Sequence, residues 1–260
     1  MALNAEYRLQ NIDRGRLRLA VIGVIAALAV GAALFVVWAR TPLGPAESAV
    51  GALSSDEQVT VTELDEGWLF SPAHERAATG VVLYPGGRVA PESYAPLARA
   101  IAVEGGAEVA LASMPLNLAV FDPGRADALM DAAPGIQRWI VGGHSLGGAM
   151  AAAYAMSSDD DRVKGLVLLA AYPADSTELA DSGLAVVSLL GSEDDVVDRP
   201  TWDEGAERLP ADTVYLVIEG GNHAQFGDYG EQPGDGVATI SAADQQRQTV
   251  AAILELLGRI

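Results

Sequence analysis

The stretch of sequence that decides the fold is RWIVGGHSLGGAMAAAYAM, residues 138–156. Its first part, 138–141, is apolar and predicts a buried strand, and its Ala-rich last part, 148–156, predicts a helix. Between them lies a G-x-S-x-G motif, from Gly143 to Gly147. The motif alone is weakly specific, because a chain with 28 glycines in 260 residues produces such a pattern by chance. Its strand–turn–helix setting is what makes Ser145 a candidate nucleophile.

The glycines of this motif have a steric purpose. A strand that reverses sharply into a helix holds its central residue in a strained backbone conformation, and flanking side chains would collide. The turn lifts the Ser145 hydroxyl above the sheet, and the start of the following helix favours nearby negative charge. The alternative is a serine that caps the helix and takes part in no chemistry.

Around this element, short apolar runs alternate with helical patterns from about residue 59 onward. The expected strands are 59–61, 68–70, 81–84, 108–112, 139–142, 163–170, 185–190 and 214–218. The expected helices are 91–104, 125–132, 145–156, 200–208 and 242–257. The first two strands predict an antiparallel hairpin, and the strands read as buried on both faces. The alternation predicts an α/β fold: a mostly parallel twisted sheet of about eight strands with helices on both faces.

The N-terminal region contains an uncharged apolar stretch over 19–39, and about 20 such residues cross a bilayer core. Four arginines precede it and one follows closely: Arg8, Arg14, Arg16, Arg18 and Arg40. This bias predicts a cytoplasmic segment 1–18, a transmembrane helix 19–39 and an extracytoplasmic body. A cleaved secretory signal is the alternative. Residues 40–58 are small and polar, with proline and glycine, and predict a flexible linker to a domain over 59–260.

Composition excludes several classes of function. The chain has 16 basic and 35 acidic residues, and without residues 1–40 the balance is 11 to 33, so the body is strongly acidic. Such a surface repels phosphate backbones, which argues against nucleic-acid binding and against adhesion to an anionic membrane surface. There is no cysteine, so disulfides, cysteine-ligated metals and thiol nucleophiles are excluded.

From about Gly80 to Leu257 the chain resembles the α/β-hydrolase superfamily. In that family the serine elbow follows the fifth strand, an acid follows the seventh and a histidine follows the eighth, and the expected strands give this order. More narrowly, the body resembles small lidless hydrolases described as dienelactone-hydrolase-like. True dienelactone hydrolases use a cysteine nucleophile, so their substrate does not carry over. The short connection 171–183 predicts that no lid domain covers the site.

A serine nucleophile needs a base, and only three histidines are present. His144 is the sequence neighbour of Ser145, whose side chain should diverge from it, and His74 precedes the third strand. His223, just past the eighth strand, is therefore the expected base. A third group must orient its ring. The family's G-x-x-D pattern selects Asp194, and the adjacent Asp195 is the alternative.

An oxyanion site needs backbone N–H donors. One is expected from Leu146, the residue after the nucleophile. The other is expected from the loop 84–89, which resembles the family's His-Gly-Gly loop and selects Gly87, with Arg88 as the alternative. A plain turn that needs glycine for its backbone angles is a further reading of this loop.

The Gly-rich stretch 225–236 follows His223, and its Phe226 and Tyr229 are expected to line the substrate pocket. Its Asp-Gly pairs hint at calcium, but their spacing matches no EF-hand, so no calcium site is expected. The expected chemistry implies no metal and no organic cofactor.

Together these features predict a serine hydrolase that acts on small carboxylic esters through an acyl-enzyme intermediate. An acyltransferase, thioesterase or peptidase would use the same triad, and a non-catalytic binding protein could keep the fold. The expected partners are an ester substrate and the membrane, and the sequence does not determine the oligomeric state.

Overall fold

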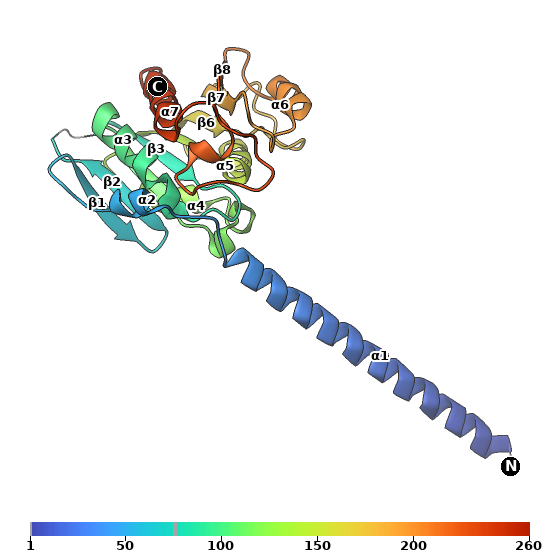
Figure 1. The fold of residues 1–260 in the computed structure, drawn as a ribbon. Helices are drawn as coiled ribbons and strands as arrows, with labels where there is room; N and C mark the ends of the chain where they lie inside the picture. The colour runs from blue at the N-terminus through green and yellow to red at the C-terminus, as the bar shows by residue number, and fades with distance from the viewer. Residues whose placement is uncertain (1, 75–76) are drawn as a thin grey trace. The chain divides into compact units, whose positions relative to one another are not determined.

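The structure is a computed structural model that describes residues 2–74 and 77–260, with side chains described from residue 15 onward. Met1 and the side chains of Arg8 and Arg14, on which the predicted N-terminal segment partly rests, lie outside the described residues. The chain forms two compact units, one ending at Thr41 and one spanning Pro42–Ile260 (Figure 1).

The first unit is a single helix, α1 (Ala2–Ala39). Its part Gly15–Ala39 contains an 18-residue window with a mean hydropathy of 2.8, and no residue of that window is buried. Within the described part of the chain, it is the one helix long and apolar enough to cross a membrane, and a signal sequence would look the same.

The second unit contains one sheet with the strand order β1-β2-β4-β3-β5-β6-β7-β8. The strands are β1 (Val59–Leu64), β2 (Gly67–Pro72), β3 (Thr79–Tyr84), β4 (Glu108–Ala112), β5 (Arg138–His144), β6 (Val163–Leu169), β7 (Ala185–Gly191) and β8 (Val214–Ile218). β2 pairs antiparallel with both β1 and β4, and all other neighbours are parallel. The predicted mostly parallel sheet with an initial hairpin is confirmed.

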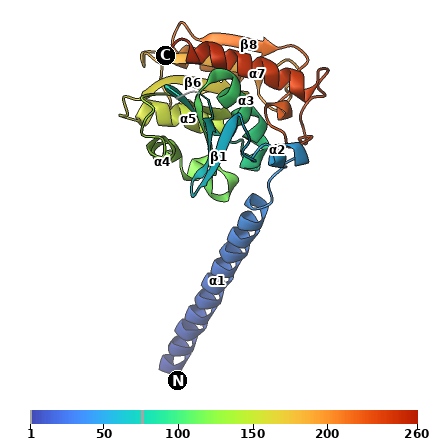
Figure 2. The ribbon, with the colours of Figure 1, turned by 90° about the vertical axis from the view of Figure 1, so that its left-hand side faces the viewer.

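Helices cover both faces of this sheet, as predicted (Figure 2). They are α2 (Glu47–Gly51), α3 (Ala95–Gly105), α4 (Arg125–Asp131), α5 (Leu146–Ser157), α6 (Arg199–Gly205) and α7 (Ala242–Leu257). One buried apolar cluster joins α3 and α7 to the sheet, and a second joins α4 and α5 to its other face. Alternate residues of a central strand serve the two clusters, with Val81 in the first and Val82 in the second.

The sequence prediction differs from the structure at several edges. β1 and β8 are not buried on both faces, and Tyr215 and Leu216 of β8 are each 38% exposed. Each of these strands lies at an end of the sheet, where it has a neighbour on one side only. The helix predicted over 91–104 is divided, since Pro91–Tyr94 form a 3-10 turn before α3.

Residues 42–58 are also different from the flexible linker that their composition predicts. They belong to the second compact unit, form α2, and bury Ala49 completely. Arg99 of α3 donates to the carbonyls of Ala52 and Ser54 and pairs with Asp56. Small residues allow this close packing as readily as they allow flexibility, which is why composition did not distinguish the two.

Candidate active site

Ser145 stands at the turn between β5 and α5 in a strained conformation, with φ 53° and ψ −123°. The surrounding backbone leaves room for glycine only. A Cβ on Gly147 would lie 2.3 Å from the carbonyl oxygen of Pro85, and one on Gly143 would lie 2.5 Å from that of Tyr84. The motif therefore forms the sharp turn that its sequence predicts, and packing against the end of β3 maintains the strain.

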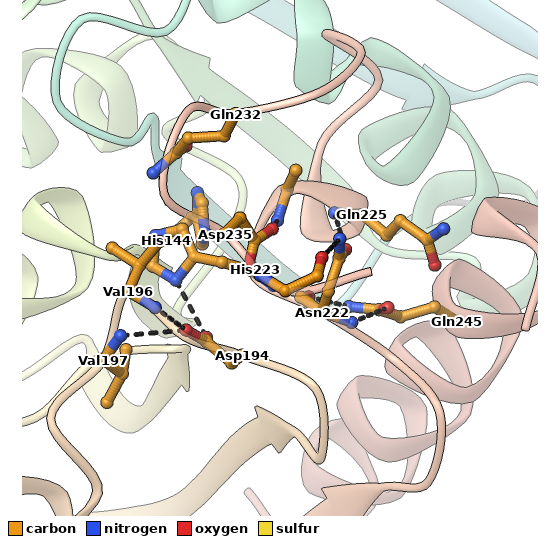
Figure 3. Close-up of polar contacts among 12 residues, drawn as sticks. His144, Asp194, Val196, Val197, Asn222, His223, Gln225, Gln232, Asp235 and Gln245 are labelled. Carbon is orange, nitrogen blue, oxygen red and sulfur yellow. Dashed lines mark hydrogen bonds and ion pairs between the residues drawn. The ribbon is translucent and has the colours of Figure 1, made fainter. Parts of the chain in front are cut away.

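Asp194, in the loop after β7, contacts the ring of His223, in the loop after β8. Its Oδ2 lies 2.8 Å from Nδ1 of His223, and both side chains are buried. Its Oδ1 accepts the N–H groups of Val196 and Val197, each at 2.9 Å (Figure 3). Three donors thus compensate the burial of one carboxylate. Asp195, the alternative, is exposed.

The backbone that carries His223 is held by two side chains that the sequence analysis did not identify. Gln245 of α7, fully buried, accepts the N–H of Asn222 at 2.9 Å and donates to its carbonyl at 2.8 Å. Asp235 accepts the N–H groups of His223 at 3.2 Å and Ala224 at 2.8 Å (Figure 3). The position of the histidine is therefore fixed from both sides.

Sequence signals for these two residues existed. Gln245 lies on the same helix face as the buried Ala252, Ile253 and Leu256, so a polar residue stands where an apolar one is expected. Asp235 belongs to an Asp-Gly pair, which is typical of a side chain that accepts from nearby backbone N–H groups. It was weighed only as a hint of a cation.

His144 occupies a position between the turn and His223. The hydroxyl of Tyr94 accepts the N–H of Gly86 at 3.0 Å and forms a hydrogen bond of 2.7 Å with Nδ1 of His144. The ring of His144 lies 4.4 Å from that of His223, centroid to centroid. Burial, together with the neighbouring His223, holds the pKa of His144 well below its usual range, so a neutral ring packs against the candidate base.

The two residues that are predicted to supply the oxyanion donors, Leu146 and Gly87, lie close together. Leu146 is the first residue of α5, so its N–H has no partner within the helix. A Cβ on Gly87 would lie 3.1 Å from Cδ2 of Leu146. The N–H of Arg88, the alternative, donates to the carbonyl of Asn117 at 2.8 Å. Because the N–H of Arg88 is already hydrogen-bonded, Gly87 is the better candidate for the oxyanion donor on that loop.

An apolar cavity of about 280 Å³ joins Ser145 to His223. Leu146, Ala149, Tyr172 and Val196 are among its walls. Larger hollows of about 430 and 500 Å³ lie elsewhere on the domain, but neither is lined by a histidine. The connection between β6 and β7 contributes residues 170–172 and 174 to the cavity wall. All residues of this connection are described, and none of them is helical.

Phe226 and Tyr229 are not in the wall of that cavity, which contradicts the sequence prediction. Both are buried, and their rings lie 5.7 Å and 6.3 Å from the ring of His144. The loop after His223 turns these aromatic side chains inward, where they pack behind the histidines.

The structure defines an α/β protein with a strained serine turn between a strand and a helix, and comparison with known proteins gives the family. The profile of the α/β hydrolase family matches residues 80–247, well over half of the chain. The chain belongs to the α/β hydrolase family. No curated protein sequence matches it.

Solved structures share this fold at low sequence identity. An esterase of Pyrobaculum calidifontis is similar with a TM-score of 0.57 and 17% identity, over 80% of this chain and 89% of that one. A predicted CIB-like hydrolase of Thermoplasma acidophilum has a TM-score of 0.56 and 16% identity, over 76% and 99%. Esterase 2 of Thermogutta terrifontis has a TM-score of 0.52 and 17% identity, over 77% and 92%.

Proposed function

We propose that this α/β hydrolase is a serine hydrolase that cleaves small carboxylic esters through Ser145, His223 and Asp194. One observation carries the proposal: a serine on a strained turn shares a cavity with a buried histidine, and that histidine pairs with a buried carboxylate at 2.8 Å. No structural role requires this combination, since a helix cap needs neither the strain nor the paired histidine.

The chemistry follows from the tautomer of His223. A carboxylate only accepts, so Nδ1 carries the proton that binds Asp194 and Nε2 is free to accept another. In the proposed reaction the oxygen of Ser145 forms a bond to the acyl carbon while its proton moves to Nε2. The alcohol leaves with that proton. Water then repeats the sequence on the acyl-enzyme, which releases the acid and restores the serine.

The N–H groups of Leu146 and Gly87 would hold the negative oxygen of each tetrahedral intermediate. Fixed donors of this kind contribute several kcal/mol, because they require no reorganisation as charge develops. The positive end of α5 adds to the same effect.

The solved neighbours support an esterase within the family. Esterase 2 of Thermogutta terrifontis is described as phosphorylated by paraoxon, at 15% identity and a TM-score of 0.51. The cavity supports small substrates, since about 280 Å³ lies just below the range of roughly 300–1,000 Å³ that is typical of ligand pockets. Its lining is mostly aliphatic, which suits an acyl chain rather than a charged group.

We also propose that α1 anchors the protein in a membrane with the hydrolase domain outside the cytoplasm. The length and hydropathy of Gly15–Ala39 support a span, and the arginines before it support this orientation. Protease treatment of intact cells that express the chain should degrade the domain, and the full-length size by mass spectrometry should show that the helix is retained.

The proposed reaction is tested with the full chain in detergent. Wild type should hydrolyse p-nitrophenyl acetate and bind a fluorophosphonate probe covalently, and Ser145→Ala should do neither. Ser54→Ala, which removes an exposed hydroxyl, is the matched control and should behave as wild type. Equal labelling of Ser145→Ala and wild type would refute the assignment, and an unlabelled wild type would favour a binding protein.

A further inference from the structure

Residues 43–48 contact both loops of the proposed catalytic site, and we refer to them as the strap. They follow α1, which ends at Ala39, after only three residues. They precede and enter the short helix α2, which Figure 2 shows beside the loops between β8 and α7. This segment was expected to be a spacer, and its contacts assign it a different purpose.

The first contact of the strap is with the loop after β3, residues 85–90, which we call the oxyanion loop. The N–H of Leu43 donates to the carbonyl of Arg88 at 2.7 Å, and the N–H of Ala90 donates to the carbonyl of Leu43 at 2.9 Å. Leu43 thus forms an isolated parallel bridge with Val89. These bonds hold the loop at Val89, two residues after Gly87.

The second contact is with the loop that carries His223, residues 223–229, which we call the histidine loop. The N–H of Ala46 donates to the carbonyl of Asp228 at 2.9 Å, and the hydroxyl of Ser48 donates to the Asp228 carboxylate at 2.5 Å. Beside them, Gly44 has φ 68°, and a Cβ there would lie 2.5 Å from Cβ of Tyr229. A side chain at Gly44 would therefore push the strap away from the loop.

Near the strap, the loop after His223 is also joined to the 3-10 turn that follows the oxyanion loop, since the N–H of Asp228 donates to the carbonyl of Ser93 at 2.7 Å. The strap adds four hydrogen bonds and spans both loops within six residues. The chain beyond the strap is held separately, because Arg99 donates to the carbonyl of Ala52 at the end of α2.

We infer that the strap is a positioning element of the active site: it fixes the position of the oxyanion loop relative to the histidine loop. The inference rests on the proposed esterase function. The segment that joins the predicted span to the domain then supports catalysis, and Leu43 and Ser48 are positioning residues that touch no substrate.

This role predicts a specific kinetic signature. Oxyanion donors and the base act mainly in the transition state, whereas the cavity walls, apart from Ser145 and His223 themselves, come from α5 and the loops after β6 and β7. Loosening the strap should therefore lower kcat and leave KM nearly unchanged.

Four variants of the full chain separate positioning from stability. Ser48→Ala removes one charge-assisted hydrogen bond at an exposed position, and we expect kcat to fall about threefold to tenfold with KM within about twofold. Ser48→Thr keeps the hydroxyl and should restore kcat. Gly44→Ala should lower kcat about tenfold or more, because it adds both strain and a steric conflict. Arg99→Met removes the contacts to residues 52–56, beyond the strap, and should lower the melting temperature while kcat stays within about twofold of wild type.

Amide hydrogen exchange provides a readout that does not depend on catalysis. The amides of Ala46 and Ala90 report the strap bonds directly, and those of residues 223–228 report the histidine loop. Ser48→Ala and Gly44→Ala should speed exchange at these sites, and Arg99→Met should not.

The outcomes distinguish the two proposals. If wild type is active and Ser48→Ala keeps its full kcat, or if Arg99→Met lowers kcat as much as Ser48→Ala, the strap is only a structural element and the inference is wrong. If wild type is inactive, the esterase proposal fails, and unchanged exchange in Ser48→Ala and Gly44→Ala would reject the strap as a brace of the loops as well.

Discussion

The replacement of Asp194 by asparagine tests the proposed site most directly. Asp194 accepts from two backbone N–H groups through Oδ1 and from His223 through Oδ2. An asparagine has one accepting oxygen, and the two backbone donors at 2.9 Å will retain it. Its NH₂ group then faces Nδ1 of His223. The ring must accept there, so its proton moves to Nε2, the atom that has to receive the proton of Ser145.

The magnitude follows from the loss of the general base. General-base catalysis contributes about 10² to 10⁴ in rate, and the equivalent exchange in serine proteases lowers kcat about 10⁴-fold. We expect Asp194→Asn to lower kcat about 10³- to 10⁴-fold, or roughly 4–5.5 kcal/mol at 1.36 kcal/mol per factor of ten. KM should change little, because Asp194 is not in the cavity wall.

The assay is the initial rate of p-nitrophenyl acetate hydrolysis by the full chain, with circular dichroism to verify folding. Asp195→Asn is the matched control: it makes the same chemical change at the next residue, which is exposed, and should retain full activity. A folded Asp194→Asn with activity within tenfold of wild type would refute the proposed role of Asp194. So would an equal loss in Asp195→Asn, since the effect would then be one of general charge.

The remaining predictions concern His144 and the cavity. Because the pKa of His144 is lowered in the folded chain, the unfolded chain binds a proton below about pH 6.5 that the folded chain does not. The free energy of unfolding should therefore decrease as the pH is lowered below about 6.5, by up to about 1.4 kcal/mol per pH unit. Denaturant melts should show that His144→Asn weakens this acid dependence, whereas His74→Asn, at an exposed site, leaves it unchanged; equal slopes in wild type and His144→Asn would contradict the reasoning. Ala149→Leu should narrow the cavity and lower kcat/KM for p-nitrophenyl butyrate about tenfold relative to the acetate, at about 0.8 kcal/mol for each displaced CH₂; an unchanged ratio would mean that the acyl chain binds elsewhere.

The sheet and the elbow could be predicted from sequence because both depend on short-range rules. Apolar runs and helical periods gave the strand and helix order, and the glycines of the G-x-S-x-G motif gave the strained turn at Ser145. The contact between Asp194 and His223 could be predicted as well, since parallel strands bring their carboxyl ends to one edge.

Contacts between distant segments were harder to predict, because each partner has an ordinary local explanation. Residues 43–48 have the composition of a spacer, and only the fold reveals that Leu43 bridges Val89. Phe226 and Tyr229 were assigned to the pocket because they follow His223, yet chain proximity does not determine which way a loop turns its side chains.

His144 shows most clearly why sequence adjacency is an incomplete guide. Its side chain was set aside because neighbouring side chains at a sharp turn diverge. Because the side chain of His144 diverges from that of Ser145, its ring lies beside that of His223. There its Nδ1 is 2.7 Å from the hydroxyl of Tyr94. A charged ring at this position would repel the imidazolium that forms on His223 during the proposed reaction, and burial prevents that charge. His144 therefore sets the spacing between the proposed nucleophile and the proposed base. Its backbone precedes Ser145, and its ring packs against that of His223.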